Sequence, residues 1–317
     1  MLAGISHYVP PNPSLWRGRD DSLPNERFFQ RVTCIDLQSQ PLPSGGSGTV
    51  IAGFASDEGI RRNLGRTGAA AGPQSLRQEL AKLACHFSAS LIDIGDIAPN
   101  DALEQGQQEL ATLLDHCHQQ GFKTLVFGGG HEIAWGHYLG LSRHYPRLGI
   151  INFDAHFDLR FPHQGSTSGT PFQQMAEFCQ QKQRSFDYCC LGIQSSSNTE
   201  SLFSLANKYK VSYLTAAQMN QNSFAWQTAF LDDFMLNHEA IYLTVCLDVF
   251  AESFAPGVSA PQALGLTPWQ VLPLLKYITQ TGKVVSIDIA ELSPPLDQGQ
   301  KTARLAAALA AQLLEFN

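Results

Sequence analysis

Short apolar runs alternate with longer amphipathic stretches from residue 48 onward. The apolar runs are nearly continuous, as is typical of parallel strands buried on both faces. The stretches between them repeat their apolar positions with the period of a helix. The predicted strands are Thr49–Phe54, Ser90–Ile94, Thr124–Phe127, Leu148–Phe153, Tyr188–Gly192, Val211–Leu214, Ala240–Leu247 and Lys283–Ile289. The predicted helices lie near residues 74–83, 101–120, 132–144, 172–183, 199–208, 224–236, 268–281 and 300–315.

Strands that alternate with helices predict a mostly parallel sheet with helices on both faces. We therefore expect a three-layer α/β/α fold with a doubly wound, mostly parallel, eight-stranded sheet. Residues 1–47 are rich in proline, glycine and polar side chains, and we expect them to form an irregular N-terminal arm. No linker interrupts residues 48–317, which we expect to fold as a single α/β domain.

The charge balance narrows the possible partners. Of the 317 residues, 21 are Lys or Arg and 28 are Asp or Glu, which gives a net charge of −7 with neutral histidines. A mildly acidic chain without a basic stripe is a poor match for nucleic acid or an anionic membrane, so any anion site must be built locally from a few arginines.

The cysteines and the N-terminus indicate a cellular compartment. The 7 cysteines are scattered without a Cys-x-x-Cys pair, which favours reduced thiols over a disulfide framework. The pattern of a signal peptide and the apolar run of a membrane span are both missing from the sequence. We therefore expect a cytoplasmic protein.

Ligand sites in such sheets lie beyond the carboxyl ends of the strands, and three predicted strand ends carry candidate ligands. The first is GGGHE at residues 128–132. Three glycines permit a tight turn that brings His131 over the edge of the sheet. A phosphate-binding loop is the alternative, although the Gly-x-Gly-x-x-Gly spacing and a following Lys-Ser/Thr are missing. The histidine is also compatible with a simple helix start.

The second strand end, DAHFD at residues 154–158, gives the strongest signal in the chain. Alternate residues of an extended segment point the same way, so Asp154, His156 and Asp158 converge. Burying two carboxylates so close together is costly unless a cation compensates them. A polar strand end that faces water is the alternative, but the apolar run before it and the strict spacing favour a metal site.

The third strand end carries Asp248, with Cys246 two residues earlier on the same face. Mixed Asp and His donors suit Mn²⁺, Zn²⁺ or Fe²⁺, and sets rich in carboxylates favour Mn²⁺ or Mg²⁺. Paired metals about 3.5–4 Å apart share bridging carboxylates and a bridging hydroxide. We interpret the three strand ends together as a two-metal site.

Four segments stand in the order found in the ureohydrolase family, which includes arginase and agmatinase: GGGHE, DAHFD, LDVFAESFAPG at 247–257 and DIAEL at 288–292. The chain resembles this family from about residue 50 to residue 315. The resemblance implies an arginase-like α/β catalytic domain with two Mn²⁺ per chain, in which a metal-bound hydroxide attacks the substrate. Family members are commonly trimers or hexamers, so a homo-oligomer is implied without a particular size.

Several segments are most similar to family members that hydrolyse N-formimidoyl-L-glutamate to L-glutamate and formamide in histidine degradation. They include DEGIRRNLGRTGAAAGP at 57–73, SGTPF at 168–172, LGIQSSSNT at 191–199 and APGVSAP at 255–261. The alternatives are another ureohydrolase that acts on a guanidino acid, or a metal-poor arginase-fold protein that has lost catalysis and serves as a binding partner.

The resemblance also implies the metal ligands. By position, His131 and Asp158 hold one metal, His156 and Asp248 hold the other, and Asp154 bridges them.

Cys246 stands where the family has a second bridging aspartate. A thiolate ligand there shifts the metal preference toward softer ions such as Zn²⁺. Alternatively, Cys246 is a bystander and one metal is weak or absent, or the site is degenerate and inactive.

Three further residues have implied catalytic roles. Asp248 accepts a proton from the nucleophile and passes it to the departing amine. Glu291 matches the acidic residue that binds the nitrogen of the substrate, although a surface glutamate is the alternative. Arginases carry a histidine proton shuttle at the position of Phe172, and His163 in the same loop is the nearest substitute. An exposed loop histidine is the other interpretation of His163.

Arginines are expected to recognise the two carboxylates of the substrate. Arg160 lies just beyond Asp158, where a guanidinium pairs bidentately with a carboxylate and disfavours cationic guanidines such as agmatine. Arg61, Arg62 and Arg66 form a candidate anion pocket beside a glycine-rich turn, and ordinary surface charges are the alternative.

Overall fold

The structure is a computed structural model that describes residues 4–163 and 165–316. Within these residues a ten-stranded sheet forms the centre of the molecule. Its strands are β1 (Tyr8–Val9), β2 (Val32–Cys34), β3 (Thr49–Phe54), β4 (Leu91–Ile97), β5 (Lys123–Gly128), β6 (Leu148–Phe153), β7 (Tyr188–Ile193), β8 (Ser212–Thr215), β9 (Ala240–Cys246) and β10 (Val284–Ala290). They follow the order β1-β4-β3-β5-β10-β9-β6-β7-β8, with β2 also paired to β4. Only β1 runs antiparallel to its neighbour among the described pairs.

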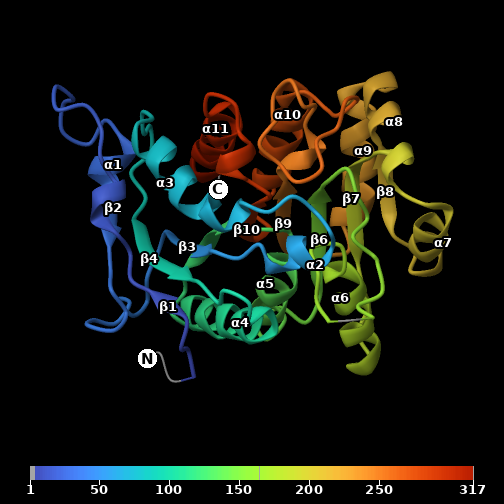
Figure 1. The fold of residues 1–317 in the computed structure, drawn as a ribbon, viewed down its shortest axis with the longest axis horizontal. Helices are drawn as coiled ribbons and strands as arrows, with labels where there is room; N and C mark the ends of the chain where they lie inside the picture. The colour runs from blue at the N-terminus through green and yellow to red at the C-terminus, as the bar shows by residue number, and fades with distance from the viewer. Residues whose placement is uncertain (1–3, 164, 317) are drawn as a thin grey trace.

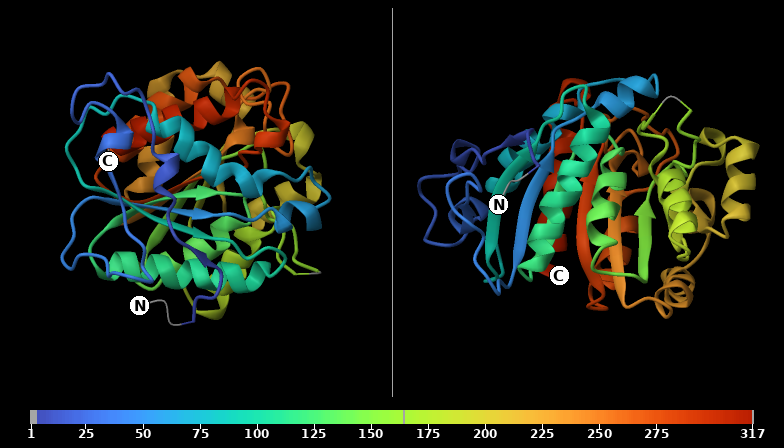
Figure 2. Two further views of the ribbon diagram at one scale, coloured as in Figure 1. Left: turned by 60° about the vertical axis from the view of Figure 1, so that its left-hand side comes forward. Right: turned by 90° about the horizontal axis from the view of Figure 1, so that it is seen from below.

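Helices cover both faces of the sheet (Figure 1). The α-helices are α1 (Phe28–Arg31), α2 (Glu58–Arg62), α3 (Gly72–Ala81), α4 (Leu103–Gln119), α5 (Ile133–Leu141), α6 (Pro171–Gln181), α7 (Glu200–Lys208), α8 (Ala216–Gln221), α9 (Phe224–Met235), α10 (Pro268–Thr279) and α11 (Lys301–Phe316). Short 3-10 helices lie at Pro13–Leu15, Ala69–Ala71, Ser195–Ser197, Leu247–Val249 and Pro294–Leu296. One layer contains α3, α9, α10 and α11, and α4, α5 and α6 lie over the opposite face (Figure 2).

The three-layer α/β/α prediction is confirmed, and each predicted strand corresponds to one of β3 to β10. The strands form because their runs are apolar throughout: all residues of β3, β6, β7 and β9 are buried. Amphipathic helices cover them and exclude water from both faces. None of the helices in the described part of the chain is both long and apolar enough to cross a membrane.

The predicted strand number and the predicted irregular arm both need correction. The arm contributes β1 and β2, which both pair with β4, and α1. Strands of two and three residues are too short to show an alternating pattern, so the sequence gives no signal for them. Their positions are decided by the unpaired backbone groups at the edge of the sheet.

A buried ion cluster fastens the arm to the sheet. Arg77 on α3 is 1% exposed, and its guanidinium pairs with Asp93 at 2.9 Å and with Asp96 at 2.7 Å. The indole of Trp16 in the arm donates a hydrogen bond to the same Asp93 carboxylate at 2.8 Å. The arm therefore shares a buried carboxylate with the central fold.

Candidate metal centre

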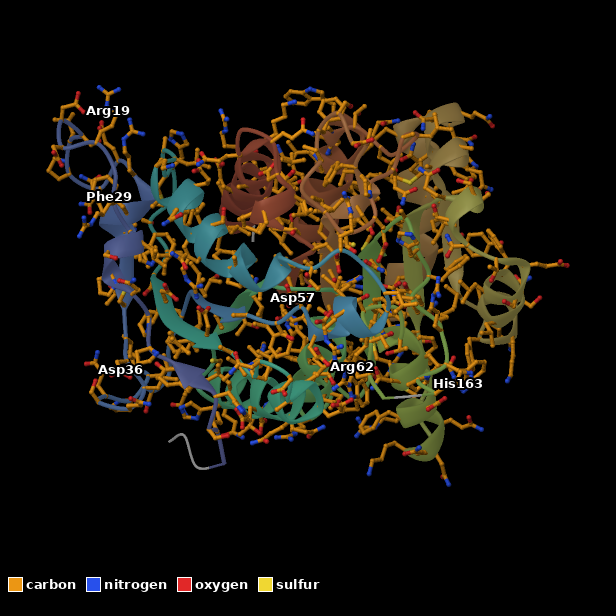
Figure 3. The ribbon with its side chains drawn as sticks, viewed as in Figure 1. Arg19, Phe29, Asp36, Asp57, Arg62 and His163 are labelled. Atoms are coloured by element: carbon orange, nitrogen blue, oxygen red, sulfur yellow. The ribbon has the colours of Figure 1, made fainter. Side chains whose placement is uncertain are left out.

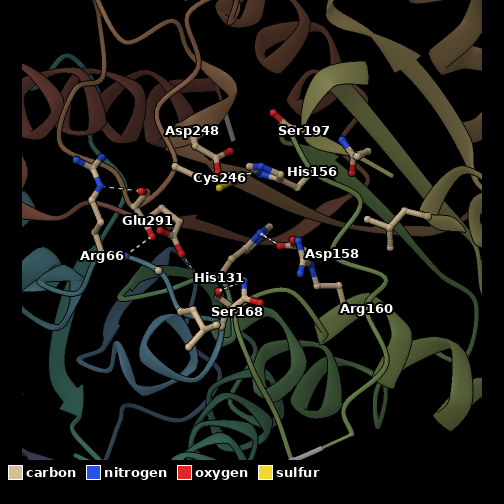
Figure 4. Close-up of a pocket in the computed structure, with 17 residues that line it drawn as sticks. Arg66, His131, His156, Asp158, Arg160, Ser168, Ser197, Cys246, Asp248 and Glu291 are labelled. Carbon is tan, nitrogen blue, oxygen red and sulfur yellow. Dashed lines mark hydrogen bonds and ion pairs between the residues drawn. The ribbon is translucent and has the colours of Figure 1, made fainter. Parts of the chain in front are cut away.

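Four neighbouring strands bring the candidate ligands to one edge of the sheet. The strands β5, β10, β9 and β6 lie side by side, and their carboxyl ends lead into the segments that contain His131, Glu291, Asp248 and Asp154. Figure 4 shows His131, Asp248 and Glu291 around one pocket, although they come from segments far apart in the sequence. The arrangement agrees with the general position of ligand sites in open α/β sheets.

The glycine turn serves close backbone packing. A Cβ atom on Gly129 would lie 1.7 Å from the carbonyl oxygen of Ser56. The amides of Gly129 and Gly130 donate to the carbonyls of Phe54 and Ser56 at 2.7 and 2.9 Å. Because these amides are already paired with backbone, the phosphate-loop alternative is wrong.

The histidines and carboxylates form two groups that share Asp154. The ligand atoms of His131, Asp154 and Cys246 lie within 4.8 Å of one another, and so do those of Asp154, His156 and Asp248. His131 Nδ1 lies 2.9 Å from Asp154, and His156 Nδ1 lies 3.0 Å from Asp248. One shared carboxylate between two donor groups is the arrangement of a bridging ligand.

Asp158 completes the first group, since its carboxylate lies 3.0 Å from His131 Nδ1. Its backbone has a φ of 48°, and Glu291 has a φ of 73°. Both lie in the left-handed region, which non-glycine residues adopt at a cost of about 1–3 kcal/mol. Strained backbone at two candidate site residues favours a functional role for this edge of the sheet.

The electrostatics fit a cation. Asp154 is fully buried, which excludes the water-facing strand end as an explanation. Burial opposes its ionisation, but hydrogen bonds with His131 and His156 outweigh this and hold the pKa of Asp154 well below its usual range. Burial raises the pKa of Asp158 to about 6, and Asp154 adds to the rise. The carboxylates of Asp154, Asp158 and Asp248 lie in one buried site and repel each other, and divalent cations relieve that repulsion.

Cys246 lies inside the site, in the same donor group as His131 and Asp154. Burial raises the pKa of the Cys246 thiol, and the negative charge of Asp154 raises it further. Without a cation the thiol therefore keeps its proton, whereas a thiol that coordinates a metal is deprotonated. This position supports ligation more than the bystander interpretation.

Glu291 is buried, so the interpretation as a surface glutamate is wrong. Its Oε1 atom accepts a hydrogen bond from the backbone amide of His131 at 3.0 Å. Its Oε2 atom is buried without a hydrogen-bond partner in the described structure. Burial raises the pKa of Glu291, and the charge of Asp248 contributes to the rise. This unpartnered carboxylate oxygen beside the candidate metal ligands is able to accept a hydrogen bond from an N–H group of a ligand.

A cavity of about 310 Å³ opens onto the candidate metal ligands and is lined by Arg66 and Arg160. The Arg66 guanidinium donates to the backbone carbonyls of Ser259 at 3.0 Å and Val258 at 2.7 Å. The Arg160 guanidinium makes no hydrogen bond or ion pair with any described residue, and in Figure 4 it lies beside Asp158. Arg160 is thus a cation in the cavity with its donors free for a ligand.

Arg61 and Arg62 do not join this cavity, which corrects the predicted three-arginine anion pocket. Both pair with Glu58, at 2.6 and 2.8 Å, and Arg62 also pairs with Glu104 at 2.5 Å. The two arginines lie on α2, a helix too short for the sequence pattern to predict, and the carboxylates of Glu58 and Glu104 pair with them.

His163 also lies outside the cavity that contains the metal ligands. It is exposed and packs against the ring of Phe161 in the loop before α6 (Figure 3). Phe172 is fully buried, with its ring 5.5 Å from that of His131 and stacked on Tyr188. The interpretation of His163 as an exposed loop histidine is confirmed, and Phe172 forms an apolar wall behind His131.

Sequence reasoning missed several residues that shape the site. Asn198 accepts from the amide of Phe157 at 3.0 Å and donates to the carbonyl of Ala155 at 2.9 Å, so it holds the DAHFD segment in place. Asn63, Ser168 and Ser197 line the cavity. An asparagine that follows a strand in a serine-rich turn was a usable signal, because such residues often bind backbone groups.

The fold and the site together define a class of protein. A sequence profile of the arginase family matches residues 47–315, and the chain belongs to that family. It is 57% identical to a protein named formimidoylglutamase from Legionella pneumophila (strain Lens), over 100% of both chains. It is 44% identical to the formimidoylglutamase of Clostridium tetani (strain Massachusetts / E88), over 96% of this chain and 95% of the relative.

Solved structures show the same fold. The crystal structure of formimidoylglutamase from Bacillus subtilis superposes with a TM-score of 0.81 at 24% identity, over 90% of each chain. Trypanosoma cruzi formiminoglutamase, solved with Mn²⁺, superposes with a TM-score of 0.79 at 24% identity, over 92% of this chain and 97% of the other.

Proposed function

We propose that this chain hydrolyses N-formimidoyl-L-glutamate to L-glutamate and formamide, as a metal-dependent hydrolase of histidine degradation. The names of its relatives at 57% and 44% identity support this activity. The observation that carries the substrate assignment is the unpaired Arg160 guanidinium in the cavity that also contains the metal ligands. A substrate with carboxylates at one end and an amidine at the other matches these two features.

Two Mn²⁺ per chain belong to this proposal. Their donors are the six side chains that converge at the sheet edge: His131, Asp154, His156, Asp158, Cys246 and Asp248. The Mn²⁺ in the Trypanosoma cruzi structure supports the choice of metal. When bound, such cations supply hydroxide at neutral pH, because they lower the pKa of water to about 7.

The protein's own residues orient and protonate the substrate. The free Oε2 of Glu291 accepts a hydrogen bond from the formimidoyl nitrogen, which aligns the carbon for attack. Asp248 acts first as a general base and takes up a proton from the attacking water. It then acts as a general acid and gives this proton to the glutamate nitrogen, as the bond between that nitrogen and the formimidoyl carbon breaks. Arg160 pairs with a carboxylate of the substrate and fixes its far end. Phe172 keeps water away from one side of His131.

A comparison of substrates tests the proposal. Mn²⁺-loaded protein is assayed with N-formimidoyl-L-glutamate, arginine, agmatine and 4-guanidinobutyrate, and its metal content is measured by elemental analysis. We expect two metals per chain and the highest kcat/KM for formimidoylglutamate. Agmatine is expected to be at least ~100-fold poorer, because it has no carboxylate to pair with Arg160 and an unpaired charge costs several kcal/mol. Faster turnover of a guanidino compound would assign the chain to another ureohydrolase activity, and absence of bound metal would indicate lost catalysis.

A cytoplasmic location and assembly into a homo-oligomer are part of the same proposal. All seven cysteines are free thiols, which is the state expected in a reducing compartment. Cell fractionation tests the location, and light scattering of the purified protein measures the number of chains per particle.

A further inference from the structure

A polar network crosses the buried face of the sheet next to His131. His131 Nε2 lies 3.0 Å from Thr244 Oγ1, and Thr244 donates to Asp288 Oδ1 at 2.5 Å. The Nδ1 atom of His137 lies 2.6 Å from Asp288 Oδ2, and the Tyr242 hydroxyl donates to the same oxygen. The network is buried throughout, since none of its members is more than 1% exposed: His131, His137, Tyr242, Thr244 and Asp288. A buried polar cluster this complete needs an explanation, because apolar residues would cost less.

The register of the strands builds this network. Thr244 on β9 is paired directly with Asp288 on β10, and Tyr242 is paired with Ser286. Since alternate residues of a strand share a face, Tyr242, Thr244 and Cys246 point to the same side of the sheet. The network is therefore continuous with the metal centre through both His131 and β9.

The direction of each hydrogen bond follows from the groups present. The two oxygens of Asp288 accept hydrogen bonds from the hydroxyls of Thr244 and Tyr242. Burial raises the pKa of Tyr242, and Asp288 raises it further, so this hydroxyl keeps its proton and donates. A threonine hydroxyl has a single proton, and that of Thr244 is used toward Asp288. Thr244 is then left only to accept from His131, which requires a hydrogen on Nε2.

We propose that Thr244 and Asp288 are positioning residues that hold the hydrogen of His131 on Nε2 and thereby reserve Nδ1 for a metal ion. Nδ1 is the nitrogen that faces Asp154 and Asp158, at 2.9 and 3.0 Å. The other neutral tautomer would place a hydrogen on the metal side and leave Thr244 without a donor. Outer partners of this kind typically contribute 10–100-fold to metal affinity.

The far side of the network gives the carboxylate its own support. His137 Nε2 lies 2.5 Å from Ser286 Oγ, and Ser286 bonds Thr124, which lies 3.2 Å from His118 Nε2. Burial lowers the pKa of His118 to about 3, so this imidazole is neutral and donates through one nitrogen only. Thr124 offers a matched control for Thr244. It is also a buried strand threonine of this network, but it makes no hydrogen bond to His131.

Mn²⁺ affinity of three variants tests the proposal, measured by the paramagnetic resonance signal of free Mn²⁺ during titration. Thr244→Val removes the hydroxyl at nearly constant volume, and we expect the dissociation constant to rise 10–100-fold. Thr244→Ser keeps the hydroxyl and Thr124→Val removes one elsewhere, so both are expected to stay within about 3-fold of the parent protein. Equal affinity of Thr244→Val and the parent would overturn the proposal, as would an equal loss in Thr244→Ser.

A second measurement uses only the parent protein, so it does not depend on the folding of a variant. Histidine-labelled, Zn²⁺-loaded parent protein is examined by ¹⁵N NMR, which distinguishes protonated from metal-bound imidazole nitrogens. We expect His131 to show a protonated Nε2 and a metal-bound Nδ1, and the reverse assignment contradicts the proposal. The inference rests on the metal site of the proposed function and not on its substrate. A parent protein without metal affinity would overturn the proposed function first, whereas the variants overturn only the positioning role.

Discussion

At the scale of single residues, Cys246 distinguishes this metal centre from the pattern of its family. The thiol occupies the position of a bridging aspartate, within reach of His131 and Asp154. Thiolates prefer softer ions, whereas carboxylates prefer Mn²⁺. We therefore propose that Cys246 influences which metal the site selects.

We expect Cys246→Asp to raise the affinity for Mn²⁺ and the Mn²⁺-dependent activity, because it restores a hard bridging donor. Titration with Mn²⁺ and with Zn²⁺ gives the ratio of the two dissociation constants, which is expected to shift at least ~10-fold toward Mn²⁺. Cys246→Ser is the control, since it keeps the size of the side chain without an anionic donor. A lower Mn²⁺ affinity in Cys246→Asp would contradict ligation at this position.

Arg160 belongs to the same scale, because its role depends on one guanidinium. Arg160→Ala is expected to raise KM for formimidoylglutamate about 10–100-fold with a small effect on kcat, since a charged hydrogen bond contributes about 1.5–3 kcal/mol. Arg160→Lys keeps the charge but loses the bidentate geometry, so its KM is expected to lie between those of the parent protein and Arg160→Ala. Unchanged steady-state kinetics in Arg160→Ala would show that another group binds the carboxylate.

At the scale of elements, the buried cluster of Arg77 joins α3, β4 and the arm. We expect Arg77→Met to lower the free energy of unfolding by about 3–5 kcal/mol, because Asp93 would remain buried without its counter-charge. Urea unfolding measures this loss. Trp16→Phe removes only one hydrogen bond from the same carboxylate and is expected to cost about 1 kcal/mol. Similar losses in the two variants would contradict the central role of the guanidinium.

His118, at the end of α4, is expected to make the stability of the fold depend on pH. Burial lowers the pKa of its imidazole to about 3. The unfolded state binds a proton near pH 6.5 and the folded state does not, so acid favours unfolding below that pH. Between pH 7.5 and 5.5 this group alone is expected to remove about 1.4 kcal/mol of stability. The loss continues until the pH reaches about 3, where the folded state also takes up the proton. Urea unfolding of metal-free protein at pH 7.5 and pH 5.5 measures this effect. The stability of His118→Gln is expected to fall by about 1.4 kcal/mol less than that of the parent between these two pH values. An identical fall in both proteins would show that His118 is not neutral at pH 5.5.

At the scale of the whole molecule, the proposed metal centre joins four strands, so we expect metal binding to raise global stability. A ligand that binds only the folded state stabilises it by mass action, by about 2.7 kcal/mol per site at a hundred times the dissociation constant. We expect chelation with EDTA to lower Tm and added Mn²⁺ to restore it, as followed by differential scanning calorimetry. Asp154→Asn, which removes the shared carboxylate, is expected to abolish the Mn²⁺-dependent part of Tm. A Tm increase of the parent's size in that variant would place the stabilising metal elsewhere.

The apolar runs made the central fold predictable, because β3, β6, β7 and β9 are buried along their whole length and β4, β5 and β10 are buried at all but one position. The ligands were predictable for the same reason, since each one directly follows such a run. The short strands of the arm and the helix α2 gave no signal, because segments of two to five residues are too short for a pattern to repeat.

The sequence by itself determined which residues stand at the strand ends and what chemistry their side chains carry. The tertiary structure decided which of them meet. It paired Arg61 and Arg62 with Glu58, left Arg160 free in the cavity, and kept His163 at the surface. It also placed Thr244 beside Asp288 and His131, through a strand register that no single segment specifies. The physical reason is that partners for buried charges and hydroxyls come from neighbouring strands, whose order is set by packing of the whole sheet.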